Sequence, residues 1–158
     1  MSTDNQTRPE FSLEQDEESV YVMLAASQLA LRTNSLLTLE FYLGGLYVVA
    51  FNRLAPYCRK PEAVNRFVAR EYGITFPIWF YWASIIRAAT SAELPGMHKS
   101  TPEVYELLRD AARSAAQYKR KISVLDLLFA VKESKTQACK RFLESGIDIE
   151  ELLADSTG

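Results

Sequence analysis

Residues 122–131 read Ile122-Ser123-Val124-Leu125-Asp126-Leu127-Leu128-Phe129-Ala130-Val131, and this stretch decides the fold class. Ser123 followed three residues later by Asp126 resembles a capping box, in which each side chain accepts a hydrogen bond from the other residue's backbone at a helix start. A leucine-rich apolar run follows. We therefore predict a helix from Ser123 to about Glu133.

Similar start and stop signals predict seven further helices. They are expected at about 14–33, 38–53, 61–72, 75–90, 101–118, 135–145 and 148–154. Gly73, for example, can adopt the left-handed backbone conformation with which many helices end. No stretch shows the two-residue alternation of apolar and polar side chains that is typical of a half-buried strand. The sequence therefore predicts an all-α fold of about eight helices.

The composition is that of one ordinary globular domain. Of 158 residues, 48% are hydrophobic and 24% are charged, and a chain of this length needs no metal or disulfide to stabilise its core. The formal charge of −2 is too small to indicate a nucleic-acid or membrane partner. We expect a disordered tail at 1–12 and a single domain at 13–154, with no cofactor.

Neither a signal peptide nor a membrane span is expected. The first six residues lack the basic and then apolar order of a signal peptide. Of the longest apolar stretches, Leu36–Leu54 contains charged residues and Phe76–Ile86 has about half the length of a span. We therefore expect a cytoplasmic protein.

The two halves of the chain carry similar motifs in the same order. Val20-Tyr21 with Leu24 matches Val104-Tyr105 with Leu108, Leu37-Thr38 matches Ile122-Ser123, and Arg66-Phe67-Val68 before Gly73-Ile74 matches Arg141-Phe142-Leu143 before Gly146-Ile147. Matching order of this kind indicates an internal repeat. We predict one four-helix repeat at about 13–90 and a second at about 101–154, joined by a linker at 91–100.

These motifs resemble the N-terminal domain of the Clp family of AAA+ unfoldases. The second copy carries the resemblance at Thr101-Pro102-Glu103-Val104, at residues 122–131, and from Phe142-Leu143 through Gly146-Ile147-Asp148 to Leu152. Residues 37–46 play the same part in the first copy. The resemblance covers about 19–154, and it implies two four-helix repeats related by a pseudo-twofold axis in a domain that receives adaptors and substrates.

The chain departs from the family at a helix-start glutamate that helps some members to bind phosphorylated arginine. In the first copy, the residue that matches this glutamate is Glu40. In the second copy, the matching residue is Leu125. The nearest match to a phosphate-binding loop, residues 96–100, lacks the glycine before its lysine. We therefore expect no AAA+ module and no ATP hydrolysis, and we retain Glu40 as a candidate contact for a partner's cation.

Residues 76–82 read Phe76-Pro77-Ile78-Trp79-Phe80-Tyr81-Trp82, the most unusual composition in the chain. A helix that is apolar on every face is either central to a core or partly presented to a partner. Tryptophan and tyrosine are favoured at interfaces because they bury a large area and keep a polar end. The candidate partner-binding residues are Phe76, Trp79, Tyr81, Trp82 and Glu40, and the choice between core and interface stays open.

Few residues suit catalysis. The only histidine, His98, lies in the linker, and the cysteines Cys58 and Cys139 are expected to stay reduced. The basic run Lys119–Lys121 has no interleaved aromatic residues, so we interpret it as a solvated surface. The sequence therefore predicts no enzyme, no metal site and no nucleic-acid partner.

Together with the resemblance, these observations predict a non-enzymatic protein-binding module. It would act as an adaptor or modulator of Clp-dependent proteolysis or substrate recognition, and its partner would be a Clp ATPase, chaperone substrate or regulator. A second hypothesis is a dedicated inhibitor or immunity-type protein that binds one toxin or enzyme, with the first copy's extra loop, Asn52–Lys60, as a contact element. The partner's identity and the oligomeric state stay open.

Overall fold

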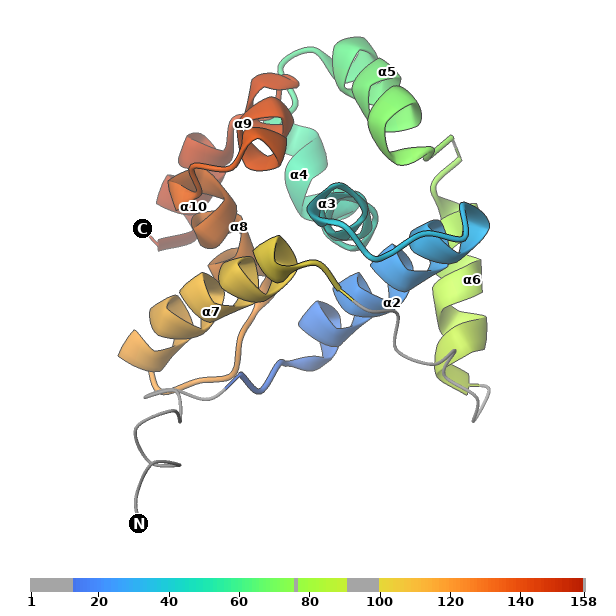
Figure 1. Cartoon of the computed structure of the whole chain (residues 1–158). Helices are drawn as coiled ribbons and strands as arrows, with labels where there is room; N and C mark the ends of the chain where they lie inside the picture. Colours follow the sequence, from blue (N-terminus) through green and yellow to red (C-terminus); the bar gives the residue numbers. More distant parts are fainter. Residues whose placement is uncertain (1–12, 76, 91–99, 158) are drawn as a thin grey trace.

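The computed structural model describes residues 13–75, 77–90 and 100–157, which form helices and no strand (Figure 1). The α-helices are α2 (Glu17–Arg32), α3 (Leu39–Val49), α4 (Phe51–Leu54), α5 (Pro61–Tyr72), α6 (Trp79–Thr90), α7 (Pro102–Gln117), α8 (Val124–Glu133), α9 (Gln137–Glu144) and α10 (Ile149–Thr157). A short 3-10 helix, η1 (Ala55–Tyr57), follows α4. The predicted all-α class of about eight helices is confirmed.

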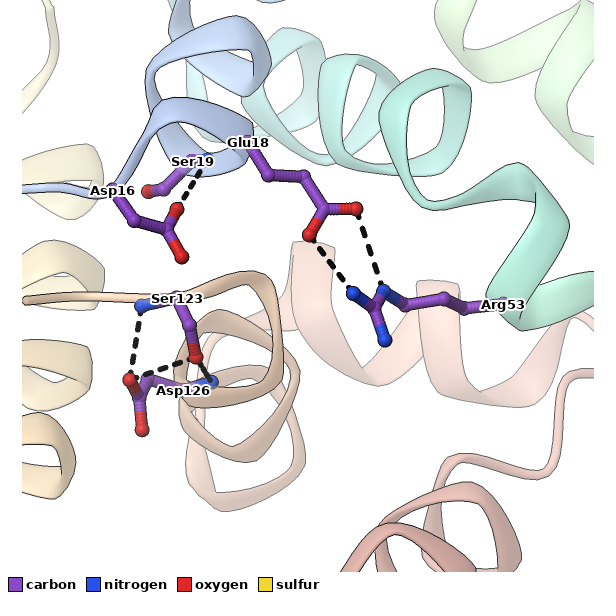
Figure 2. A network of polar contacts seen from close by, with 6 residues as sticks. All are labelled: Asp16, Glu18, Ser19, Arg53, Ser123 and Asp126. Atoms are coloured by element: carbon purple, nitrogen blue, oxygen red, sulfur yellow. Dashed lines mark hydrogen bonds and ion pairs between the residues drawn. The ribbon is translucent and has the colours of Figure 1, made fainter. Parts of the chain in front are cut away.

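Several helices begin at polar side chains that cap their first turn. Ser123 and Asp126 form both hydrogen bonds of the predicted capping box at α8. At α2 the capping residue is Asp16, whose carboxylate accepts a hydrogen bond from the backbone N–H of Ser19 (Figure 2). The helix expected at about 38–53 is divided at Ala50, its last residues belong to α4, and η1 follows in the segment beyond it. This break turns the chain towards α10, which packs against both short helices.

The centre of the fold is the crossing of α2 and α3, and Figure 1 shows α3 end-on among the other helices. A Cβ atom at Gly45 would lie 2.6 Å from the carbonyl oxygen of Val22 and 2.7 Å from the backbone nitrogen of Ala26. Real Cβ atoms do not approach backbone atoms so closely. The two helix backbones therefore touch because residue 45 has no side chain.

Backbone hydrogen bonds tie each half of the chain to the other. The N–H of Asp16 donates to the carbonyl oxygen of Ile122 at 2.9 Å, and the N–H of Thr101 donates to that of Leu37 at 3.1 Å. Asp16 and Thr101 are 85 residues apart, and so are Leu37 and Ile122. Two similar repeats that pack against each other would form such a reciprocal pair of hydrogen bonds. These contacts therefore support the repeat, which itself stays a prediction.

The extra segment expected in the first copy, residues 52–60, contacts other parts of the chain. Arg53 forms an ion pair with Glu18 at the start of α2, with a nitrogen–oxygen distance of 3.0 Å (Figure 2). Arg59 pairs with Asp148 at the start of α10, at 2.6 Å. The segment thus joins the first half of the chain to its last helix.

Candidate partner-binding surface

Helix α6 lies at the edge of the fold and packs mainly against α2 (Figure 1). Ile78, just before the helix, and Ile85 within it are buried. By contrast, Trp79, Phe80 and Ile86 expose 60%, 56% and 54% of their surface. We call this exposed group, which consists of two aromatic residues and one isoleucine, the α6 aromatic face. The helix therefore has one side in the core and one apolar side in contact with solvent.

Trp79 and Phe80 form a stacked pair, with ring centroids 4.0 Å apart and an angle of 24° between the planes. Trp79 is among the candidate residues predicted from the sequence, whereas Phe80 is not. The sequence does contain a signal that Phe80 faces solvent, because the polar residues Ser84 and Arg87 follow it at helical spacing. Polar residues mark the side of a helix that faces solvent.

The hydroxyl group of Tyr81 is fully engaged within the chain. It donates a hydrogen bond to the carbonyl of Gly73 at 2.9 Å, and it accepts hydrogen bonds from the N–H of Thr75 and from Arg32, both at 3.0 Å. Burial alone would raise the pKa of Tyr81, but these donors stabilise the phenolate and lower the pKa. Tyr81 thus fixes α6 to the end of α2 and to the segment that precedes α6.

The remaining candidates lie apart from the α6 aromatic face. The half-buried ring of Trp82 meets the ring of Tyr21 edge-on, with centroids 6.2 Å apart. Glu40 is exposed in the first turn of α3, and its charge contributes to the raised pKa of Cys139 on α9, where burial is the largest influence. Glu40 forms no hydrogen bond or ion pair with the described residues of α6, and Phe76 lies outside the described residues.

The described residues offer little for catalysis or metal binding. They contain no group of three or more side chains that could hold a metal ion. Cys58 and Cys139 are not joined in a disulfide, and burial raises the pKa of both thiols, which favours the unreactive protonated form. His98 lies outside the described residues. In the same part of the chain, no helix is long and apolar enough to cross a membrane.

The sequence matches no model of a known protein family and no curated protein. The resemblance to Clp N-terminal domains therefore depends on the motifs quoted above.

Proposed function

We propose that this chain is a non-enzymatic protein-binding module whose contact surface includes the α6 aromatic face. The observation that carries the proposal is the exposure of Trp79 and Phe80, each more than half accessible to solvent. Large aromatic side chains contribute strongly to binding when a partner covers them. Adjacent exposed apolar residues of this size commonly mark an interaction site.

The way α6 is held supports this role. Ile85 anchors its inner side in the core, and the hydroxyl of Tyr81 is hydrogen-bonded to the segment before the helix. A surface that is already ordered loses less conformational entropy when it binds. The α6 aromatic face is therefore presented on a fixed helix, as a docking surface requires.

We further propose that the partner belongs to Clp-dependent proteolysis, as an unfoldase, a substrate or a regulator. The support is the order of motifs that resembles the Clp N-terminal repeat, together with the exchanged contacts of Asp16 with Ile122 and of Thr101 with Leu37. In the predicted two-repeat arrangement, α6 is the last helix of the first repeat. It would act as a surface for adaptor or substrate binding without a cofactor.

A comparative pull-down tests both parts of the proposal. Three tagged proteins are used to capture partners from native lysate. They are the wild type, the double variant Trp79→Ala/Phe80→Ala and the control Tyr105→Ala. Tyr105 is a suitable control because it is 52% exposed but lies on α7. We expect the wild type and the control to capture a Clp ATPase or protease component, and the double variant to lose it at unchanged helical content.

Two outcomes would contradict the proposal. Capture that the double variant does not weaken would place the contact surface elsewhere on the chain. Specific recovery of a single protein with no Clp component would favour the inhibitor or immunity hypothesis instead.

A further inference from the structure

The short segment between α5 and α6 has a counterpart between α9 and α10. Gly73-Ile74 and Gly146-Ile147 are matched motifs of the two copies, and they follow the ends of α5 and α9. Both glycines have a positive φ, of 69° and 123°, and both isoleucines are buried. Residues 73–75 and 146–148 are therefore corresponding backbone edges. We call them the first edge and the second edge.

The second edge is paired with the extra segment of the first copy. Cys58 and Ile147 form an isolated antiparallel bridge. Beside it, the N–H of Arg59 donates a hydrogen bond to the carbonyl oxygen of Gly146 at 2.9 Å, and the N–H of Asp148 donates to that of Tyr57 at 2.8 Å. An extended stretch of the chain thus satisfies both backbone groups of this edge, as a neighbouring strand would.

At the first edge, one side chain takes the place of such a stretch. The hydroxyl of Tyr81 accepts a hydrogen bond from the N–H of Thr75 at 3.0 Å and donates one to the carbonyl oxygen of Gly73 at 2.9 Å. These are the two backbone groups that correspond to those of Asp148 and Gly146.

The first edge is also open to solvent. Gly73 and Thr75 are exposed, whereas Gly146 and Asp148 are half-buried. The second copy has no long segment with which to cover it, because only residues 134–136 separate α8 from α9, whereas residues 50–60 lie between α3 and α5. The Tyr81 hydroxyl therefore satisfies an edge that the described backbone leaves uncovered.

The charges beside the two edges have opposite signs. At the second edge, the carboxylate of Asp148 pairs with Arg59 of the covering segment, with a nitrogen–oxygen distance of 2.6 Å. At the first edge, a guanidinium nitrogen of Arg32 lies 3.0 Å from the hydroxyl oxygen of Tyr81. A segment that covered the first edge would therefore gain most from an acidic residue where the chain's own segment has Arg59.

The chain supplies no carboxylate of its own for Arg32. Its interactions with described residues are the hydrogen bond to Tyr81 and a contact over the ring of Tyr81, 5.5 Å from the centroid. Residues 72–92 include no acidic residue, and the nearby Glu71 is already paired with Arg141. The positive charge beside the first edge is thus uncompensated by any ion pair among the described residues.

We propose that the first edge binds an extended segment of a partner protein, which displaces the Tyr81 hydroxyl. One residue of this segment accepts a hydrogen bond from the N–H of Thr75, and the residue two positions later donates one to the carbonyl of Gly73. The second of these residues is aspartate or glutamate and pairs with Arg32. It is never proline, which has no N–H to donate.

The chain's own segment at the second edge is the precedent for this occupant, and addition of an extended peptide to an exposed backbone edge is a recurring mode of recognition. The exchange leaves the buried Ile78 and Ile85 in place, so α6 keeps its core contacts. The inference rests on the proposed function, a protein-binding module with its contact surface at α6, and names the kind of segment that the partner contributes.

An NMR titration of the isotope-labelled full chain tests the proposal, because amide shifts both detect weak binding and locate it. The probe is the peptide Leu-Ala-Pro-Tyr-Ser-Glu-Lys-Pro, which copies residues 54–61 with serine in place of Cys58 and glutamate in place of Arg59. We expect saturable shifts centred on the amides of residues 73–75. Methylation of the glutamate backbone nitrogen removes the N–H but keeps the charge, and it should weaken binding about tenfold.

Two variants of the chain sharpen the test. Tyr81→Phe should bind the peptide about fivefold more tightly, because no hydroxyl competes for the edge. The matched control Tyr105→Phe removes an exposed hydroxyl on α7 and should bind as the wild type does. The wild type should prefer the glutamate peptide to its glutamine version by about threefold, and Arg32→Gln should lose this preference.

Absence of saturable shifts, shifts confined to helices other than α5 and α6, equal binding of the methylated peptide, or weaker binding to Tyr81→Phe would overturn the proposal. The pull-down with Trp79→Ala/Phe80→Ala tests the proposed function separately. Loss of captured partners in that variant, together with failure of the peptide to bind, would uphold the proposed function and overturn this inference alone.

Discussion

The guanidinium group of Arg120 donates a hydrogen bond to the carboxylate of Asp126 across the turn between α7 and α8, with Nη2 2.8 Å from Oδ1. The Arg120 side chain is 43% exposed, whereas that of Asp126 is 1% exposed. The hydroxyl of Ser114 and the N–H of Ser123 donate to the same carboxylate. One buried carboxylate therefore connects the last turn of α7 with the first turn of α8.

Replacement of Asp126 should destabilise the protein. Asp126→Ala removes a helix cap and a charge-assisted hydrogen bond, and we expect the free energy of unfolding to fall by about 2–3 kcal/mol. Arg120 can still reach solvent, which limits the loss. Urea denaturation measures the change. The control Asp110→Ala breaks the exposed ion pair with Arg113 and should cost less than about 1 kcal/mol; equal losses in the two variants would contradict this role for Asp126.

The same residue should contribute to the acid sensitivity of the fold. Burial would raise the pKa of Asp126, but hydrogen bonds from Arg120, Ser123 and Ser114 outweigh burial and lower it. A carboxyl whose pKa is lower in the folded state stabilises the protein above its unfolded pKa, about 3.9, and this contribution is lost as the pH falls through the folded pKa.

We therefore expect the difference in unfolding free energy between the wild type and Asp126→Asn to be full at neutral pH and to shrink below about pH 4. Urea denaturation at a series of pH values measures it. A difference that grows in acid would show that the folded-state pKa of Asp126 is raised instead.

The contact of α2 with α3 should not tolerate a methyl group. Alanine favours helices over glycine by about 1 kcal/mol, yet Gly45→Ala should still destabilise the protein by about 2 kcal/mol or more, because the new Cβ would meet backbone atoms of α2. Gly73→Ala is the comparison, because it has open space but a φ of 69° and should cost about 1–2 kcal/mol. Thermal and urea unfolding rank the two; a stabilised Gly45→Ala would refute the close approach.

Loss of the Tyr81 hydroxyl should loosen α6. Tyr81→Phe removes the hydrogen bonds to Gly73, Thr75 and Arg32, and we expect a loss of about 1–2 kcal/mol with faster amide exchange in α6. The exposed Tyr105 offers a matched control, and Tyr105→Phe should change neither quantity. Unchanged exchange in Tyr81→Phe would mean that the core contacts of Ile85 alone hold the helix.

Local signals made much of the helical structure predictable. The capping box of Ser123 and Asp126 forms as expected, and Gly73 adopts a φ of 69° at the end of α5. Both features depend on side chains and backbone within a few residues of each other. The break at Ala50 escaped prediction, since it lies within a continuous apolar run and the chain there turns to meet α10.

The surface was harder to predict than the helices. Residues 79–82 are all aromatic, so periodicity cannot say which of them face the core. Neighbouring helices decide this: Trp82 meets Tyr21, whereas Phe80 remains exposed. The hollow lined by Tyr118 and Phe129 could not be predicted either. Its walls come from helices separated by loops, and only the packed fold brings these helices together.

The contact between Asp16 and Ile122 has a consequence for synthesis of the chain. Asp16 is made well before its backbone partner, which lies more than a hundred residues further along the chain. Leu37 meets its own partner, Thr101, somewhat sooner. On the ribosome, where domains form as their residues emerge, Asp16 must therefore wait for residue 122 to leave the exit tunnel before it can form this hydrogen bond.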